Sequence, residues 1–411
     1  MVLAVLILLW NSSIFFLADA RKRPVENAVT ASVICFNFTF YWGLLNFLTG
    51  FPVYVFFILQ ALKPINKKNW VLFVLISFLL FMSHALWFLA GVISSGILIL
   101  IHREKLKTAF LKLSSLVPVM IIAAFWYPTL AETRKSHGAD ISAHWISSFF
   151  TRLSPQYITD VLLGGIKNHS EMIVACLVFT WIFMSVYTNR KKLFSETDKP
   201  LFTCALFLIG IMLFAPETYM NTLFFSKRWF PVGMILLILS LPAPFIKSKR
   251  PVLVTAICLL LFLTINTSRS WYLFQKYELT GLENALITLP SDKKVIGLDF
   301  VKSSEYIKNR PFLQMFAYSQ ALKGAQLNFS FTEHASGIVK YKKTPEKEWT
   351  PGLEWIPERV SHKDFKFFDY AVINGKKDMH TKILAFKYLE QMTTDGRWRL
   401  YKIDRDKIPK K

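Results

Sequence analysis

Strongly apolar runs of roughly 15 to 20 residues recur through the first 268 residues of the chain, and short basic clusters separate them. A helix needs about 20 mostly apolar residues to cross the hydrocarbon core of a bilayer. The sequence therefore predicts an integral membrane protein. The clearest expected spans are Val2–Ala18, Ala109–Tyr127, Met172–Tyr187, Leu201–Met220, Trp229–Phe245 and Val252–Asn266.

The distribution of charge divides the chain into two parts. Only 18% of the 411 residues are charged, and 38 are Phe, which is atypical of a soluble protein. Residues 1–268 carry 23 Lys and Arg against 10 Asp and Glu, whereas residues 269–411 carry 26 against 17. We therefore expect an α-helical polytopic membrane bundle over residues 1–268 and a water-soluble α/β domain over residues 269–411.

The net charge of +22 is spread over clusters between the apolar runs and does not form one patch, so nucleic-acid binding is disfavoured. Short loops rich in Lys and Arg remain on the cytoplasmic side of a membrane. This rule places four segments inside: Lys63–Lys68, His102–Lys107, Asn189–Lys199 and Ile246–Arg250. It places outside the loop Pro128–Ser170, the loop Asn221–Arg228 and everything after Thr267, so the second domain is expected to be extracytoplasmic.

Two longer apolar stretches, Pro24–Leu62 and Trp70–Ile101, each lie between two basic clusters. One crossing would put those clusters on opposite faces, whereas two full crossings need about 40 apolar residues and a turn. We expect each stretch to form a hairpin of two short or tilted helices, with turns near Gly43–Gly50 and near Ser83-His84. The bundle would then hold about ten full or short membrane segments, with a cavity open to the outer face.

The outer loop, residues 128–170, has an amphipathic pattern. Apolar residues recur at helical spacing over Ile141–Leu153, and the pattern repeats after Pro155. A Trp- and Phe-rich helix too short to span is expected to lie flat in the membrane interface. Packing on the exported domain is the alternative, and either placement would flank the mouth of the cavity.

The exported domain alternates short apolar strands with helical stretches, which favours an open α/β sheet. Strands are expected at Lys294–Phe300, Gly337–Tyr341, Phe368–Ile373 and Trp398–Ile403, and helices at Pro311–Lys323 and Asp378–Met392. No nucleotide-binding or nucleophile motif occurs, so no cofactor is assigned. Asp299 is a site candidate because ligands of open sheets gather at the carboxyl ends of strands; a solvated loop carboxylate is the alternative.

Polar groups inside a membrane are costly, so each suggests a function. His84 could hydrogen-bond a phosphate or a sugar hydroxyl, or it could cap the break between two helices. Asn46 could contact a substrate, or it could simply form the other turn. At the expected outer face, Glu217, Lys227 and Arg228 lie at one level. They could grip a phosphate, for which Arg offers a planar fork and Lys a point charge, or form interfacial ion pairs.

Four further candidates lie in the outer loop: Glu132, His137, Asp140 and His144. They show no metal-ligand spacing such as HExxH, so the residues assign no metal site. Solvated loop residues are the alternative for all four.

Several segments together resemble one group of proteins. They are YWGLLNFLTGFPVY, the central His in LLFMSHALWFL, the Arg in KRWFPVGMILL, and the tail segments FDYAVING and RWRLYKIDR. In these the chain resembles uncharacterised bacterial membrane proteins related to the GT-C glycosyltransferases, over nearly its whole length. The resemblance implies a helical bundle with an outward-facing cavity in the bacterial cytoplasmic membrane. It also implies transfer of a sugar from a polyprenyl-phosphate donor to an envelope acceptor, with His84 and Arg228 lining the cavity and facing the phosphate.

The resemblance fails at the catalytic base. Family members carry an Asp or Glu, acting as general base or ligand of a divalent metal, in the outer loop after their first helix. Here Met1–Ala18 resembles a middle helix and leads to a basic cluster, so the helices that carry the base are expected upstream of Met1. Asp140 is the best substitute. The alternative function is a non-catalytic membrane protein that binds lipid-linked glycan or scaffolds an envelope complex. A transporter is disfavoured because the hairpins have no later counterpart.

Overall fold

The computed structural model describes residues 2–136, 140–244, 249–330, 342 and 348–409. The chain forms two compact units. Unit 1 comprises Met1–Gly165 and His169–Asn266, and unit 2 comprises Ile166–Asn168 and Thr267–Lys411. Each unit is described by itself.

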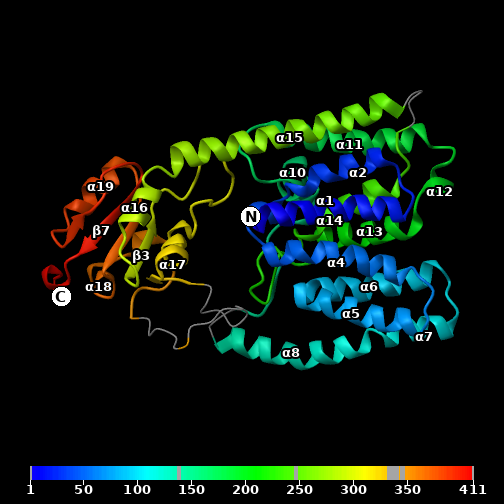
Figure 1. Ribbon diagram of the computed structural model, residues 1–411, viewed down its shortest axis with the longest axis horizontal. Coiled ribbons are helices and arrows are strands. Elements are labelled where there is room, and N and C mark those ends of the chain that lie inside the picture. Colours follow the sequence, from blue (N-terminus) through cyan, green and yellow to red (C-terminus); the bar gives the residue numbers. More distant parts are fainter. Residues whose placement is uncertain (1, 137–139, 245–248, 331–341, 343–347, 410–411) are drawn as a thin grey trace. The chain divides into compact units, whose positions relative to one another are not determined.

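Unit 1 is a bundle of helices that lie side by side (Figure 1). Its longer helices are α1 (Val2–Ala20), α4 (Leu45–Ala61), α5 (Lys67–Ser83), α6 (Ala85–Ile101), α8 (Val117–Ser136), α11 (Ser170–Thr188), α13 (Lys199–Phe214) and α14 (Trp229–Ser240). Shorter helices are α2 (Val25–Ser32), α3 (Phe38–Tyr41), α7 (Leu106–Ser114), α9 (Phe149–Arg152), α10 (Pro155–Leu162) and α12 (Leu193–Glu196). Helix α15 (Lys249–Glu278) begins in unit 1 and ends in unit 2.

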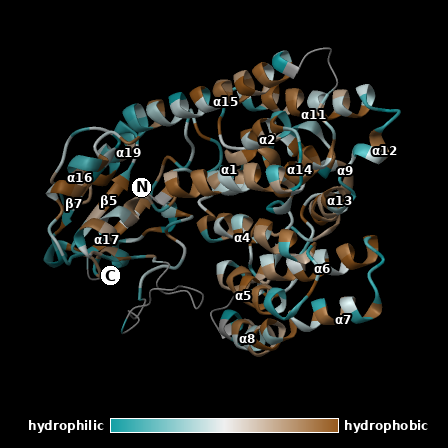
Figure 2. Cartoon of the chain, turned by 45° about the vertical axis from the view of Figure 1, so that its right-hand side comes forward, coloured by the Kyte–Doolittle hydropathy of each residue, from teal (hydrophilic) through white to brown (hydrophobic). Residues whose placement is uncertain are grey.

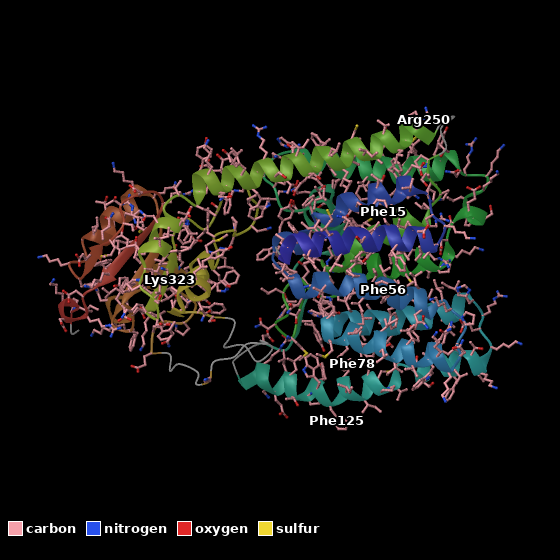
Figure 3. All side chains as sticks on the ribbon, in the orientation of Figure 1. Phe15, Phe56, Phe78, Phe125, Arg250 and Lys323 are labelled. Atoms are coloured by element: carbon pink, nitrogen blue, oxygen red, sulfur yellow. The ribbon has the colours of Figure 1, made fainter. Side chains whose placement is uncertain are left out.

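Three helices in the described part of the chain are long and apolar enough to cross a membrane: Leu3–Ala20, Ser170–Thr188 and Arg250–Glu278. The pair Leu106–Ser114 and Val117–Glu132, bent by 46°, passes the same test as a single broken span. Apolar residues dominate the helices of unit 1 (Figure 2). Phe15, Phe56, Phe78 and Phe125, labelled in Figure 3, lie on four different helices and are 39–78% exposed. Such an exposed apolar surface fits contact with lipid.

Two predicted spans are shorter than expected, and each is followed by a proline. The segment Leu201–Met220 was predicted as one helix, but α13 ends at Phe214, and α14 ends at Ser240 instead of Phe245. Pro216 and Pro242 explain both ends, because a proline disfavours the helical region for the residue before it. Ala215 and Leu241 accordingly adopt ψ angles of 159° and 154°.

Two other predicted spans are longer or interrupted. The segment Ala109–Tyr127 was predicted as one straight helix, but α7 ends at Ser114 and α8 begins at Val117, with a bend of 46° between them. Helix α15 continues well beyond the predicted end at Asn266, to Glu278. Residues 267–278 are mainly polar and aromatic, which lowers the hydropathy of this segment, but such residues can continue a helix.

Both predicted turns fall within the expected ranges. Gly43, with a φ of +65°, precedes α4, and such a φ is readily adopted by glycine. His84 alone separates α5 from α6 and adopts an extended backbone with φ −174° and ψ 128°. Helices α5 and α6 pack against each other as a hairpin (Figure 1). The first half of the Pro24–Leu62 stretch is not one helix but α2, a 3-10 turn at Val33–Cys35 and α3.

Basic residues from distant segments gather at one end of unit 1. The Arg23 guanidinium donates hydrogen bonds to the carbonyl oxygens of Leu239, Ser240 and Leu241 at 2.8–2.9 Å, and to that of Glu196 at 3.0 Å. These bonds satisfy carbonyls that the end of α14 leaves without helical partners. Arg21 pairs with Asp198 at 2.7 Å. Arg23, which precedes α2, thereby holds the end of α14.

The close contact of α4 with α6 depends on Gly50. A Cβ atom at Gly50 would lie 2.0 Å from Cδ1 of the fully buried Trp87, whose Nε1 donates to the Phe47 carbonyl at 2.7 Å. We expect Gly50→Ala to lower the free energy of unfolding by about 1–3 kcal/mol, the usual cost of overpacking. In α6, by contrast, a Cβ at Gly96 would meet no atom within 4 Å.

Gly96→Ala is therefore the matched control, and we expect it to be neutral or stabilising by up to about 1 kcal/mol through helix propensity. Thermal unfolding of both variants in the same detergent tests the comparison. Equal midpoints for the two variants would contradict the packing argument.

The predicted amphipathic helix over Ile141–Leu153 is wrong. Residues Ala143–His144 form strand β1, which pairs antiparallel with β2 (Thr218–Tyr219), and only Phe149–Arg152 is helical, as α9. The strand pairing of Ala143–His144 with the chain before α14 prevails over the helical spacing of the apolar residues. Helix α10 does begin at Pro155, as expected, with the Ser154 hydroxyl accepting from the Tyr157 amide at 3.3 Å.

Unit 2 contains a mixed five-stranded sheet in the order β4-β3-β5-β7-β6. Strand β3 is parallel to β4 and β5, whereas β7 is antiparallel to β5 and β6. The strands are β3 (Lys294–Asp299), β4 (Gln326–Leu327), β5 (Tyr370–Asn374), β6 (Leu389–Gln391) and β7 (Trp398–Ile403). The helices of this unit are α16 (Leu282–Thr288), α17 (Tyr318–Lys323), α18 (His362–Phe365) and α19 (Lys377–Leu384).

The predicted strands at β3, β5 and β7 are confirmed, and Gly337–Tyr341 lies outside the described residues. The predicted helix Asp378–Met392 is half wrong, because α19 ends at Leu384 and Leu389–Gln391 joins the sheet as β6. Leu389 is buried and Glu390 exposed, the alternation of an edge strand. The predicted helix Pro311–Lys323 is helical only from Met315, and it ends at Gly324 with φ +66°.

Candidate anion-binding site

Arg228 is the most unusual charged residue of unit 1. It directly precedes α14 and is only 7% exposed. Its Nη2 donates to the Leu223 carbonyl at 2.7 Å, whereas its Nε is buried without an acceptor among the described residues. Burial, and to a lesser degree the charge of Arg134, lower the pKa of Arg228 to about 10, so the guanidinium remains charged at neutral pH.

The ring of Phe47 contacts both Arg228 and His84. The Arg228 guanidinium carbon is 5.6 Å from the Phe47 centroid, and the His84 ring packs edge-on against Phe47 at 5.7 Å. Trp87 and Trp229 contact Phe47 at centroid distances of 4.9 and 5.2 Å. Arg228 and His84 therefore contact one aromatic platform, Phe47, whose ring face favours the Arg228 cation.

His84 caps α6, which is one of the two roles that its place in the sequence allows. Its Nδ1 accepts a hydrogen bond from the Leu86 amide at 3.2 Å, at the start of α6. This bond fixes the ring orientation and leaves Nε2 to face other groups. His84 lies within electrostatic reach of both Arg228 and Arg134.

Arg134 is the second cationic group of the site. It lies near the end of α8 and donates from Nη1 to the Met220 carbonyl and, at 3.0 Å, to the Thr222 hydroxyl. Both acceptors belong to the α13–α14 loop, residues 215–228. Neither Arg134 nor Arg228 forms an ion pair with a described carboxylate. Two arginines that repel each other in a partly buried place are costly unless an anion compensates them.

The α13–α14 loop is strained around these residues. Met220, Asn221 and Phe224 adopt φ angles of 48°, 57° and 58°, which non-glycine residues rarely adopt. Three further buried donors in or beside the loop have no acceptor among the described residues: Trp42 Nε1, Ser226 Oγ and Trp229 Nε1. The Trp42 ring packs at a tilt against Phe224 of the loop, with the centroids 4.5 Å apart. Buried donors of this kind are normally satisfied, so their concentration near Arg228 indicates a place for an acceptor-rich group.

Glu217 and Lys227 form an ion pair of their own, at 3.3 Å, apart from Arg228. Arg152, fully buried, approaches the same carboxylate at 3.5 Å, and the Ser147 amide donates to it at 2.8 Å. Burial raises the pKa of Glu217, but the hydrogen bonds from Ser147 and the charge of Lys227 outweigh it and leave the pKa below its usual value. Lys227 also lies over the Tyr157 ring at 4.8 Å. The predicted interfacial pairing fits these contacts.

The remaining outer-loop candidates lie elsewhere. Asp140 is exposed, and hydrogen bonds from Ser142 and His144 lower its pKa to about 2. Glu132 and Asn46 are exposed, and His137 lies outside the described residues. No group of three or more His, Cys, Asp or Glu that could hold a metal ion occurs in the residues with described positions.

Asp299 lies at the carboxyl end of β3 in unit 2, as its position in the sequence predicts, and is buried. Its Oδ1 accepts from the amides of Val301 and Lys302 at 3.2 Å and from Asn374 Nδ2 at 2.9 Å. Burial raises the pKa of this carboxyl. These bonds hold the chain turn after β3 and the end of β5 together, which is a structural role.

The sequence did not single out Arg134 or Phe47. The predicted candidates of the outer loop, residues 128–170, were acids and histidines, whereas the informative residue of that segment is a cation, Arg134, which lies in the last turn of α8. Phe47 carries no signal of its own among 38 phenylalanines. No family model matches the chain, and no curated protein or solved structure matches it either.

Proposed function

We propose that this chain is an integral membrane protein that binds the phosphate of a polyprenyl-phosphate-linked sugar at Arg228 and passes the sugar to an envelope acceptor. One observation carries the binding proposal: Arg228 shares the Phe47 platform with His84, lies near Arg134 and has no described carboxylate partner. A phosphate would supply acceptors for Arg228 Nε and balance the two guanidinium charges through charge-assisted hydrogen bonds.

The proposed location is a bacterial cytoplasmic membrane, with the basic end of unit 1 on the cytoplasmic side. Support comes from Arg21 and Arg23, which contact residues 196–198 and 239–241 at one end of the bundle. Under the positive-inside rule this end is cytoplasmic. The α13–α14 loop, at the opposite end of α13 and α14, would then face outward, as would the soluble GT-C-type terminal domain.

In the proposed reaction, an acceptor hydroxyl oxygen attacks the anomeric carbon, and the bond from that carbon to the phosphate oxygen breaks. Arg228 and Arg134 would stabilise the charge that develops on the departing phosphate. The proton of the acceptor hydroxyl must pass to a base. Asp140 is the candidate, but a carboxylate with a pKa of about 2 accepts protons poorly at neutral pH.

A non-catalytic role in binding lipid-linked glycan is the second candidate. The observation that favours it is that both candidate carboxylates already have hydrogen-bond or ion-pair partners. Glu217 is held by Lys227 and the Ser147 amide, and Asp140 by Ser142 and His144. This candidate keeps the Arg228 site and omits the transfer step.

The test uses the purified full chain in nanodiscs with a fluorescent polyprenyl-phosphate sugar. We expect saturable binding that polyprenyl phosphate displaces at least about tenfold more effectively than uncharged polyprenol, because charge-assisted hydrogen bonds contribute about 1.5–3 kcal/mol. Equal displacement by the two lipids would refute a phosphate site. Consumption of the donor with an added envelope fraction supports transfer, and saturable binding without consumption supports the second candidate.

A further inference from the structure

A groove of about 950 Å³ lies within unit 2, between the C-terminal end of α15, α16 and α17. Its lining residues all fall within residues 271–323, so the groove is a property of this unit alone. We call it the α15–α17 groove.

The walls of the α15–α17 groove expose large apolar side chains. Tyr272, Ile287, Tyr318 and Leu322 are 60%, 68%, 52% and 64% exposed. These residues come from three different helices, so the fold of unit 2 brings them together. No single helix carries the whole apolar surface. A soluble domain rarely concentrates so many exposed large apolar residues without a binding function.

Basic side chains border the apolar walls. Lys276 lies over the rings of Tyr272 and Tyr277, at 5.7 and 5.3 Å from their centroids, and Lys323, labelled in Figure 3, ends α17. Glu283 is the one acid of the lining. The groove therefore combines aromatic and aliphatic contacts with an excess of positive charge.

The length of α15 sets the level of this groove relative to a bilayer. A span needs about 20 residues at a rise of 1.5 Å per residue, so a crossing that begins at Arg250 ends near residue 270. The next residues, Trp271, Tyr272, Lys276 and Tyr277, are of the kinds that anchor a helix at the headgroup level. They are also residues of the groove or its edge.

We propose that the α15–α17 groove rests on the membrane surface and binds anionic phospholipid headgroups there, with the apolar side chains inserted at the interface. Continuity with the apolar span of α15 and the positive border favour this occupant over a soluble protein or peptide. The proposal rests on the membrane crossing by α15 and not on the sugar chemistry. Headgroup binding in the α15–α17 groove would hold unit 2 against the bilayer.

The test places one fluorophore on Leu322→Cys in the full chain, in a background where Cys35, Cys176, Cys204 and Cys258 are replaced by Ala. Unit 2 has no native cysteine, so the labelled position is unique. The matched control is Leu384→Cys on α19 of the same unit, which is also exposed, at 43%. Both proteins are placed in nanodiscs of phosphatidylcholine with or without phosphatidylglycerol, and quenching by a headgroup-level spin-labelled lipid is measured.

We expect quenching at position 322 to exceed that at position 384 at least threefold, and phosphatidylglycerol to increase it. Lys276→Glu with Lys323→Glu should remove the effect of phosphatidylglycerol. Equal quenching at the two positions would overturn the proposal. Quenching at position 322 that does not change with phosphatidylglycerol would also overturn it. A label on the exposed native Cys258 of α15, quenched by acyl-chain-labelled lipid, reports the crossing separately. Binding of polyprenyl phosphate at Arg228 is an independent measurement.

Discussion

Replacing Arg228 by Ala should weaken binding of a polyprenyl-phosphate sugar about ten- to hundredfold. Charge-assisted hydrogen bonds to a phosphate contribute about 1.5–3 kcal/mol, and each 1.4 kcal/mol is a factor of ten in Kd. Arg228→Lys should recover only part of the affinity, because an ammonium retains the charge but not the planar fork. Equilibrium binding to each purified variant in nanodiscs measures both losses.

The control is Arg190→Ala, which removes an exposed arginine at the basic end of unit 1. Its affinity should equal that of the wild type if the effect at Arg228 is local. Arg228 also donates a hydrogen bond to the Leu223 carbonyl, so its replacement must be checked for folding. Size-exclusion profiles of Arg228→Ala, Arg228→Lys and Arg190→Ala provide this check. A folded Arg228→Ala protein with unchanged Kd would refute the phosphate site.

Replacing Arg152 by Met should strongly destabilise unit 1. The Arg152 guanidinium donates to the carbonyls of Met212, Leu213 and Ala215 at 2.6–3.1 Å, at the end of α13, and faces Glu217. Removing the guanidinium leaves these buried carbonyls without a donor, and each unsatisfied buried polar group costs about 1–3 kcal/mol, whereas Glu217 keeps its ion pair with Lys227. Denaturant unfolding in mixed micelles, followed by Trp fluorescence, measures the loss.

A double variant separates the ion pair from the helix cap. Arg152→Met combined with Glu217→Gln should recover none of the loss, because Glu217 keeps Lys227 at 3.3 Å and the Ser147 amide at 2.8 Å as partners in the single variant. Arg190→Met serves as the exposed control and should unfold like the wild type. Equal stability of Arg152→Met and the wild type would show that the buried guanidinium contributes nothing to the fold.

The apolar helices of unit 1 and the main strands of unit 2 could be predicted from the sequence. Hydropathy and a composition rich in strand-forming residues are properties of short segments, so they can be recognised without knowing the fold. The turn at His84 could also be located, since a polar residue interrupts an apolar stretch between two basic clusters. The ends of α13 and α14 could have been placed from Pro216 and Pro242. These features depend on neighbours along the chain.

The site required long-range contacts that a single sequence does not reveal. Arg228 and His84 could be predicted from their positions in the apolar segments, but their meeting across Phe47 depends on how α4, α5 and α14 pack. Arg134 reaches the site because the α13–α14 loop folds back to α8. The helix expected over Ile141–Leu153 failed for the same reason, since a partner 75 residues away, Thr218–Tyr219, took part of it into a strand pair.

The hydrogen bonds from Arg23 to four carbonyl oxygens bear on how the helices could separate to give access to the site. Separating α2 from α14 at that end would leave the Arg23 guanidinium without its acceptors and the carbonyls at the end of α14 without their donor. Arg228 lies at the other end of the same helix, where Arg134 of α8 donates to the Met220 carbonyl and the Thr222 hydroxyl, and Arg228 donates to the Leu223 carbonyl. Opening the bundle at either end of α14 would therefore break hydrogen bonds from an arginine to backbone carbonyls.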